Sequence, residues 1–266
     1  MSRLSLLSNH TNAPLKGLAA AFAQAGAKAI IITARKVETL KETEALIKKI
    51  NPSVEVLPVA LEVVSESSVN AAYATIAKTY PVIDTLVHNA GVYNSSGQSL
   101  RAGDVAKWWD DIETNGKGSF LVGRGFYAQV PADKKDAHVI YMSSGAANWA
   151  FPEQSGYGIS KLVQVRLAAS GAAENPNVRV VAMHPGVVAT DMATEPFMAY
   201  ALDQPLLPGS FAVWLTSPAA AFLSGRFVWA NWDVEEILAR KDEIVQQNLL
   251  TMQLTGTLHG NIAEVR

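Results

Sequence analysis

Short β-branched apolar runs alternate along this chain with longer segments of helical period. The candidate strands are residues 4–7, 29–33, 54–60, 83–87, 138–142, 178–183 and 227–230. Between them, residues 17–25, 37–50, 65–79, 104–130 and 158–174 repeat apolar positions with helical spacing. Strand followed by helix in this order predicts an α/β fold, with a parallel sheet covered by helices on both faces.

Composition narrows the class of protein. The chain has 266 residues, of which 49% are hydrophobic and 17% charged, so it is not intrinsically disordered. No linker or repeat divides it, which predicts a single domain over residues 1–266. Twenty-two Lys and Arg against 24 Asp and Glu leave no broad basic surface for nucleic acid or an acidic membrane.

The cysteine count and the hydropathy pattern exclude further classes of site. With no Cys there is no disulfide, thiolate nucleophile or cysteine-ligated metal, and we predict no metal site. No apolar stretch is long and uninterrupted enough to span a membrane, and the N-terminal apolar run is too short for a secretory signal. A cytoplasmic protein is therefore expected.

Four polar motifs stand at predicted strand ends or on the helices that follow them. They are Asn89-Ala90-Gly91, Ser143-Ser144-Gly145, Tyr157-Gly158-Ile159-Ser160-Lys161 and Pro185-Gly186-Val187-Val188-Ala189-Thr190. A parallel sheet binds ligands at the carboxyl ends of its strands. Each motif alone is common as a turn or by chance, but their shared placement favours one functional site.

The pair Tyr157 and Lys161 suggests acid–base chemistry, because residues four apart share a helix face. Lowering the pKa of a phenol by ~3 units from ~10 takes roughly 4 kcal/mol. A cation about 4 Å away supplies that at an effective dielectric of ~20. Tyr157 is thus expected to exchange a proton near neutral pH, with the hydroxyl of Ser144 binding the same substrate oxygen.

Together these motifs resemble the short-chain dehydrogenase/reductase family, and the resemblance covers nearly the whole chain. It implies a single Rossmann-type domain with a doubly wound sheet. It also implies a tetrad in which Tyr157 is the general acid/base, Ser144 orients the substrate carbonyl, Lys161 lowers the tyrosine pKa and holds the nicotinamide ribose, and Asn115 holds a relay water. The tetrad Asn lies in Asn115-Gly116-Lys117-Gly118-Ser119-Phe120.

The resemblance also implies cofactor contacts and an assembly. Matching positions that would contact a dinucleotide are Glu62, Asn89, Ala90, Gly91, Tyr157, Lys161, Pro185, Gly186, Val188 and Thr190. Glu62 stands where the family usually has Asp. Residues 104–130 and 155–173 match helices that often form family dimers or tetramers, which implies a homodimer or homotetramer acting on a small-molecule substrate.

One expected motif, the glycine-rich loop after the first strand, is degenerate here. An ungapped count back from Gly26 places Asn9, Ala13 and Leu15 where the family has its three glycines, and the first glycine of the chain is Gly17. Ala13 intrudes on the pyrophosphate, and Leu15 implies a shifted helix or a refilled crevice. These changes weaken the phosphate site.

The charges near the predicted adenosine end favour NADP(H) over NAD(H). The second strand ends Thr33-Ala34-Arg35-Lys36, without the acidic residue that holds a free ribose hydroxyl. Arg35 and Lys16 could instead bind a 2′-phosphate, unless they are ordinary surface charges.

The substrate region is expected to be apolar. Family analogy predicts a lid at about residues 190–215 and a helical extension at about residues 233–266. Trp149, Phe151 and Phe197 suggest a pocket for an apolar, aromatic or polycyclic substrate of specialised metabolism, with hydrophobic packing as the alternative interpretation.

Three functions remain open from the sequence. The first is NADP(H)-dependent reduction of a ketone or oxidation of an alcohol. The second is cofactor-independent, non-redox chemistry on the same fold, such as dehydration, isomerisation or cyclisation, which the lost glycines favour. The third is a non-catalytic binding protein, against which the complete tetrad argues.

Overall fold

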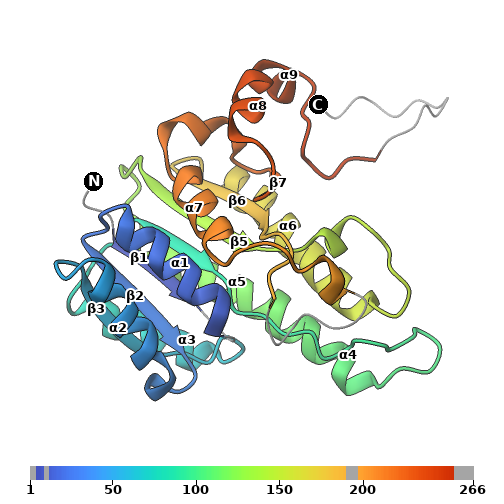
Figure 1. The fold of residues 1–266 in the computed structure, drawn as a ribbon, viewed down its shortest axis with the longest axis horizontal. Helices are drawn as coiled ribbons and strands as arrows, with labels where there is room; N and C mark the ends of the chain where they lie inside the picture. The colour runs from blue at the N-terminus through green and yellow to red at the C-terminus, as the bar shows by residue number, and fades with distance from the viewer. Residues whose placement is uncertain (1–3, 9–11, 190–196, 255–266) are drawn as a thin grey trace.

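The sheet of this protein has seven parallel strands in the order β3-β2-β1-β4-β5-β6-β7 (Figure 1). The structure is a computed structural model that describes residues 4–8, 12–189 and 197–254. The strands are β1 (Leu4–Ser8), β2 (Ala29–Ala34), β3 (Glu55–Ala60), β4 (Thr85–His88), β5 (Ala137–Met142), β6 (Val178–His184) and β7 (Phe227–Trp229). The order reverses between β1 and β4, which opens a crevice at the carboxyl ends of these two strands.

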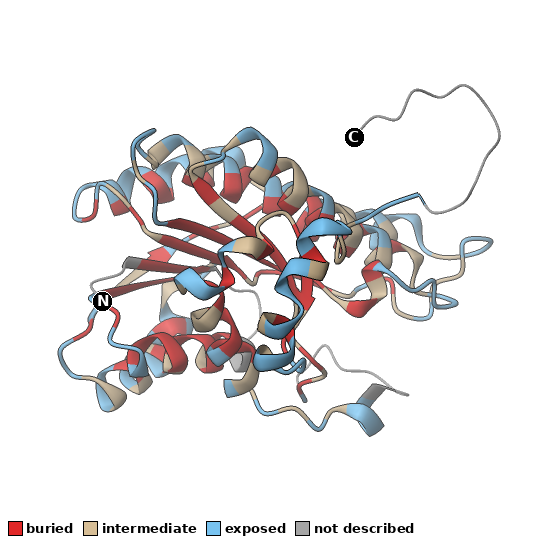
Figure 2. Cartoon of the chain, turned by 90° about the horizontal axis from the view of Figure 1, so that it is seen from above, coloured by how far each residue is buried: buried red, intermediate tan, exposed pale blue. Residues whose placement is uncertain are grey.

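Helices cover both faces of this sheet because successive strand residues point to opposite sides. Leu6 and Ile31 belong to one core cluster, with α3 (Glu66–Ala77), α5 (Gly118–Gln129) and α6 (Ser155–Glu174). Leu7 and Ile30 belong to the other, with α1 (Asn12–Gln24), α2 (Lys41–Ile50) and α7 (Leu206–Leu215). Figure 2 shows the buried strands between these two layers. The predicted single α/β domain with a doubly wound sheet is confirmed.

The remaining elements are short. They are α4 (Val105–Asp111), α8 (Val234–Ala239), α9 (Lys241–Gln246), a π-helix (Ile112–Lys117) and the 3-10 helices Val37–Leu40, Gly145–Ala147, Phe197–Tyr200 and Pro218–Leu223. Among the described residues, we find no helix with the length and apolarity to cross a membrane.

All seven predicted strands are confirmed, but three longer predictions differ from the structure. The helix predicted over residues 104–130 is α4, a π-helical turn and α5 in succession. The helical extension predicted over residues 233–266 contains two short helices in its described part, and its residues 255–266 lie outside the described residues. The Asp233 carboxylate caps the first helix by accepting from the Glu235 N–H. The predicted lid over residues 190–215 begins outside the described residues, and its last part is α7, which buries Phe211, Ala212 and Leu215 in the core.

Candidate active site

The ends of three strands and one helix surround a cavity of about 420 Å³. Asn89 and Gly91 follow β4, Ser143 and Ser144 follow β5, and His184 and Pro185 lie at the end of β6. The first two turns of α6 contribute Tyr157 and Lys161 to the same cavity. The predicted polar motifs are thus brought together at the carboxyl edge of the sheet.

Two hydroxyl groups meet in this cavity. The Tyr157 phenol forms a hydrogen bond with Ser144, whose own Oγ also accepts from the Ala146 N–H at 3.3 Å. The ring of Tyr93 lies against that of Tyr157, with centroids 4.5 Å apart. A substrate oxygen placed at this pair could receive hydrogen bonds from both hydroxyls.

Lys161 lies behind the tyrosine rather than at its hydroxyl. Its ammonium is 5.6 Å from the centre of the Tyr157 ring and donates to the main-chain oxygen of Met142 at 2.9 Å. The lysine is 3% exposed, so its charge is held almost entirely out of water. The i, i+4 spacing correctly predicted that the two residues are neighbours.

Burial shifts the pKa of both groups toward the neutral form. Loss of water raises the pKa of Tyr157 to about 12, while the Ser144 hydrogen bond works in the other direction. Burial lowers the pKa of Lys161 to about 7, and the Asp111 carboxylate partly offsets this. The expectation that Lys161 lowers the pKa of Tyr157 toward neutrality is wrong for this structure, because desolvation is the largest effect on the phenol and raises its pKa.

Asn115 lies in the π-helical turn between α4 and α5 and is fully buried. Its Oδ1 accepts from the Val92 N–H at 2.8 Å, and its Nδ2 donates to the Val92 oxygen and to Ser160 Oγ. The side chain therefore fixes the loop after β4 to α6. A π-helical turn inside a helix is a frequent mark of a functional site.

Gln164 was missed by the sequence analysis, although it lies on the same face of α6 as Tyr157 and Lys161. It is fully buried, and its Oε1 accepts from Lys161 Nζ at 3.3 Å. Its Nε2 donates to the main-chain oxygen of Asn115 at 3.2 Å and to Ser119 Oγ at 2.9 Å. One amide thus joins the lysine to the π-helical turn. Its spacing of three from Lys161 was the available signal.

Asp111, at the end of α4, is a second buried polar residue that the sequence analysis missed. Its carboxylate accepts from the Asn94 N–H at 2.8 Å and from the Ser95 hydroxyl at 2.5 Å. Burial raises the pKa of Asp111, and the hydrogen bonds from Ser95 and Asn94 oppose that shift. Its contacts fix the loop that carries Tyr93.

The residues at one end of the cavity fit the nicotinamide riboside half of a dinucleotide. A Cβ atom on Gly91 would lie 3.0 Å from Asn115 Oδ1 and 3.1 Å from Lys161 Nζ, so only glycine keeps this approach open. Asn89 and Val188 line the same cavity, whereas Ala90 is buried beside it.

The turn after β6 is held by one acidic residue. Gly186 has φ +83°, a conformation that glycine adopts without strain. The Asp203 carboxylate accepts from the Val187 N–H at 2.7 Å, and the Asp203 N–H donates to the Val187 oxygen at 3.1 Å. Pro185, Gly186 and Val188 are therefore held against the cavity. Thr190, also predicted to bind cofactor, lies outside the described residues.

The phosphate end has no glycine cradle in the first turn of α1. The helix begins at Asn12, as the ungapped match to the family requires. Leu15 is fully buried and belongs to the core cluster that contains Phe211 of α7, which favours the refilled crevice over a shifted helix. A Cβ atom on Gly17 would overlap the main-chain oxygen of Pro205. Asn9 lies outside the described residues.

The predicted adenosine contacts are surface residues. Lys16 forms an ion pair with Glu42 at 2.7 Å. Arg35 is exposed just after β2. Glu62, partly buried after β3, donates its main-chain N–H to Ser68 Oγ at 2.9 Å. The structure therefore spaces these three residues along the edge formed by β1, β2 and β3.

The predicted substrate residues Trp149 and Phe151 both line the cavity, with ring centroids 6.1 Å apart. Phe197 begins a 3-10 helix whose Tyr200 lines the cavity. Trp229 of β7 lines it as well and was missed, because nothing in its local sequence distinguishes it from a core residue.

His184 was interpreted as structural, and it holds the turn that follows β5. Its Nδ1 accepts from the Gly145 N–H at 3.2 Å, and its ring packs edge-on against Trp229 with centroids 4.6 Å apart. Burial lowers the pKa of His184 to about 4, so the imidazole is neutral at physiological pH.

Comparisons with known proteins agree with this geometry. The profile of a family described as short chain dehydrogenase matches residues 16–200. The short chain dehydrogenase mpl6 of Monascus purpureus is 35% identical over 246 residues, covering 89% of this chain and 83% of that protein. The short chain dehydrogenase andI of Emericella variicolor is 32% identical, covering 90% of this chain and 84% of that protein.

Solved structures share the fold. An actinorhodin polyketide ketoreductase with NADPH superposes with a TM-score of 0.75 at 21% identity, covering 87% of this chain and 98% of that one. An NAD⁺-bound xylitol dehydrogenase gives a TM-score of 0.76 at 18% identity, covering 85% and 96%.

Proposed function

Since the chain belongs to the short-chain dehydrogenase family, we propose that it is an NADP(H)-dependent oxidoreductase that reduces a ketone, or oxidises the alcohol, of an apolar small molecule. The observation that carries the proposal is the meeting of the Tyr157 and Ser144 hydroxyls in a largely apolar cavity, with Lys161 buried behind them.

The protonation state of Tyr157 favours the reductive direction. With a pKa of about 12, the phenol keeps its proton across the physiological range. It can therefore donate that proton to a carbonyl oxygen as negative charge develops there, while Ser144 donates a second hydrogen bond. In the oxidative direction the phenolate is needed, and burial makes it costly.

NADPH, when bound, would supply the hydride for the carbonyl carbon. Lys161 and Tyr157 would hold its ribose, and Asn89, Gly91 and the Pro185–Val188 turn would orient its nicotinamide. The exposed Arg35, without an acidic neighbour at the end of β2, supports the phosphorylated cofactor over NADH.

Lys161, Gln164 and Asn115 would together restore the proton that Tyr157 gives away. A lysine with a pKa near 7 exchanges protons readily at neutral pH. The Gln164 Oε1 accepts a hydrogen bond from the Lys161 amine, and the Gln164 Nε2 donates one to the main-chain oxygen of Asn115. Gln164 is thus proposed to act in this proton path together with Asn115, to which the family resemblance assigns the relay water.

The aromatic lining supports an aromatic or polycyclic substrate of specialised metabolism. Trp149, Phe151, Tyr200 and Trp229 all face the cavity, and apolar walls with a few convergent polar groups are typical of small-molecule sites.

Homo-oligomerisation in the cytoplasm is part of the same proposal. Exposed apolar side chains on α4, α5 and α6 support a subunit contact there: Val105, Phe120 and Ile159.

The test combines calorimetry with turnover of a ketone panel, followed as NADPH oxidation. We expect NADPH to bind and Tyr157→Phe to lower kcat by roughly 10²–10⁴-fold, with the NADPH affinity within a few-fold of wild type. Calorimetry that detects no binding of NADPH or NADP⁺ at millimolar concentration, together with product formed without cofactor and detected by chromatography, would overturn the redox proposal in favour of non-redox chemistry.

A further inference from the structure

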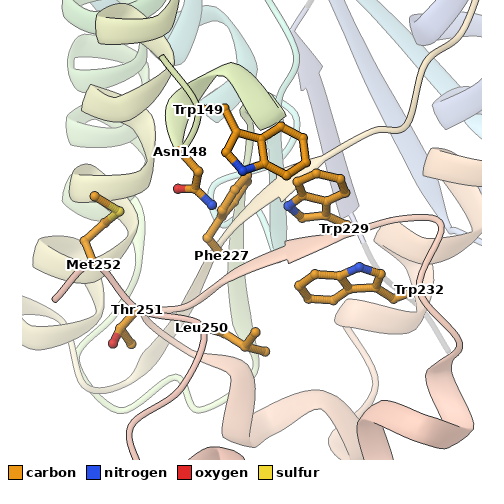
Figure 3. Close-up of a pocket in the computed structure, with 8 residues that line it drawn as sticks. All are labelled: Asn148, Trp149, Phe227, Trp229, Trp232, Leu250, Thr251 and Met252. Carbon is orange, nitrogen blue, oxygen red and sulfur yellow. The ribbon is translucent and has the colours of Figure 1, made fainter. Parts of the chain in front are cut away.

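A second cavity of about 360 Å³ lies beside the catalytic one and shares Trp149 and Trp229 with it. Its other walls come from β7, the loop after it and the segment after α9 (Figure 3). The three indole rings of Trp149, Trp229 and Trp232 gather on one side, while Thr251 and Met252 lie across from them. We call this space the aromatic side cavity.

The wall chemistry selects a neutral aromatic ligand. Trp149 and Trp229 meet edge to face with centroids 5.0 Å apart, and Trp232 lies nearly parallel to Trp229, at 4° and 5.9 Å. Half of the six tryptophans of the chain therefore surround one cavity. Its lining contains no charged side chain, and Asn148 and Thr251 are its polar members. Indole faces bind flat rings, and no acidic or basic side chain of the lining would form an ion pair with a charged ligand.

These tryptophans remain partly open to solvent. Trp149 is 56% exposed and Trp232 is 37% exposed, and Met252 beside them is 46% exposed. Each ring could bury 150–250 Å² in a filled site. Exposed aromatic side chains gathered around a hollow mark a binding site rather than a core.

The side cavity begins next to the reacting groups. A Cβ atom on Gly145 would lie 3.4 Å from the six-membered ring of Trp229 and 3.6 Å from that of Trp149. Gly145 directly follows Ser144, and its N–H is held by His184, which packs on Trp229. The two indole rings therefore extend from Gly145, the residue after Ser144, to the aromatic side cavity.

We propose that the aromatic side cavity binds a neutral aromatic ring of the same molecule whose ketone lies between Ser144 and Tyr157. Binding of the ring stands on the cavity alone, whereas its part in turnover rests on the proposed function. The substrate is then an elongated molecule, with the reacting carbonyl at one end and an aromatic ring beyond the Trp149–Trp229 pair.

Fluorine NMR of the full-length chain labelled with 5-fluorotryptophan tests the binding directly, with 2-naphthol as the probe. We expect the Trp232 signal, which reports on the side cavity alone, to shift by more than its linewidth on saturation. The signals of Trp109 and Trp214, which line neither cavity, should stay in place. Single Trp→Leu variants assign the signals.

Kinetics with two ketones test the link to turnover. For 4-(2-naphthyl)cyclohexanone, Trp232→Leu should raise KM roughly tenfold with kcat unchanged, the size expected for loss of an aromatic contact and its buried area. For cyclohexanone, too small to reach the side cavity, the same variant should leave KM within twofold. Trp109→Leu, on the exposed face of α4, is the matched control and should alter neither substrate.

The negative results distinguish an error in the side cavity from an error in the proposed function. A Trp232 fluorine signal that does not shift with millimolar 2-naphthol overturns the side cavity as a binding site, whether or not the protein reduces ketones. A signal that moves on dilution without any probe would mean that a second copy of the chain covers the cavity, and this too overturns the proposal. If 2-naphthol binds but NADPH and NADP⁺ do not and neither ketone is reduced, the proposed function fails and the ring site stands.

Discussion

At the scale of single residues, burial sets the chemistry of the site. Tyr157 and Lys161 are neighbours, as their spacing predicted, yet the ammonium donates to the Met142 oxygen and to Gln164. Burial moves both pKa values toward the neutral form, up for the phenol and down for the amine. The sequence could not show this, because it fixes which residues share a helix face but not how much water reaches them.

The buried lysine makes stability depend on pH. Since burial lowers the pKa of Lys161 to about 7, the unfolded chain binds more protons than the folded one from pH 7 upward, and wild-type stability gains from rising pH. Lys161→Met lacks this group. The free energy of unfolding of this variant minus that of wild type should therefore be highest at pH 7. By pH 10 this difference should fall by on the order of 4 kcal/mol.

Urea unfolding of both proteins across that range measures the difference. Lys78→Met, at an exposed position on the surface, is the control and should give a difference that does not change with pH. A flat profile for Lys161→Met as well would mean that the lysine is solvated in the folded protein.

Gln164 should set the pH range in which Lys161 works. Gln164→Glu places a carboxylate at the oxygen that now accepts from Lys161 Nζ at 3.3 Å. An opposite charge at this distance raises the pKa of an amine by about 1–3 units. The inflection at which kcat/KM for ketone reduction falls as Lys161 loses its proton should therefore move to higher pH in the variant, by at least about one unit.

Gln24→Glu, exposed at the end of α1, controls for the added charge and should leave the inflection in place. A Gln164→Glu profile that superimposes on wild type would show that Gln164 has only a packing role. Thermal unfolding of the variant, measured alongside, separates that result from loss of the fold.

At the scale of elements, the contact between α1 and α7 replaces the glycine loop as the feature that shapes the phosphate end. The sequence identified Leu15 at a glycine position and left open a shifted helix or a refilled crevice. The burial of Leu15 in the core cluster that also contains Phe211 favours the refilled crevice. The packing role of α7 was not predictable from periodicity, because Leu206–Leu215 is apolar on almost every side.

The close approach of these helices predicts that Gly17 does not tolerate a side chain. A methyl group there would overlap the Pro205 oxygen, and α7 would have to move away. Gly17→Ala should therefore lower the free energy of unfolding by about 1–3 kcal/mol, despite the better helix propensity of Ala. Gly116→Ala is the control, because its methyl would meet the Val163 side chain at an ordinary 3.4 Å.

Denaturant unfolding of the two variants measures this contrast. Equal free energies of unfolding for Gly17→Ala and wild type would show that α7 moves away from α1 without loss of stability. The phosphate end would then be more open than the packing of α1 and α7 indicates.

At the scale of the whole molecule, the two cavities differ in how far they could be predicted. The strand ends and motifs around the cavity that contains Tyr157 were identified from the sequence, because a parallel sheet brings its carboxyl ends to one edge. The aromatic side cavity was not, since Trp149 meets Trp229, Trp232 and Met252 from distant parts of the chain, and no local motif marks the last three.

Cofactor affinity at the phosphate end should depend on single surface charges. The net charge of −2 provides no attractive field for an anion, and the first turn of α1 has no glycine cradle. Lys16 is tied to Glu42 across an exposed 2.7 Å ion pair. Exposed pairs of this kind are worth about 0.2–1 kcal/mol, so Glu42→Gln should free Lys16 and strengthen NADPH binding by about two- to fivefold.

The gain should be specific to the 2′-phosphate. Calorimetry should show the change for NADPH at low salt and little of it at 0.5 M salt, where charges are screened, whereas the NADH affinity stays constant. Glu38→Gln, which removes an exposed carboxylate from the neighbouring 3-10 helix, controls for the change in net charge. An equal gain for both nucleotides, or for both variants, would place Lys16 away from the 2′-phosphate and leave Arg35 as the discriminating cation.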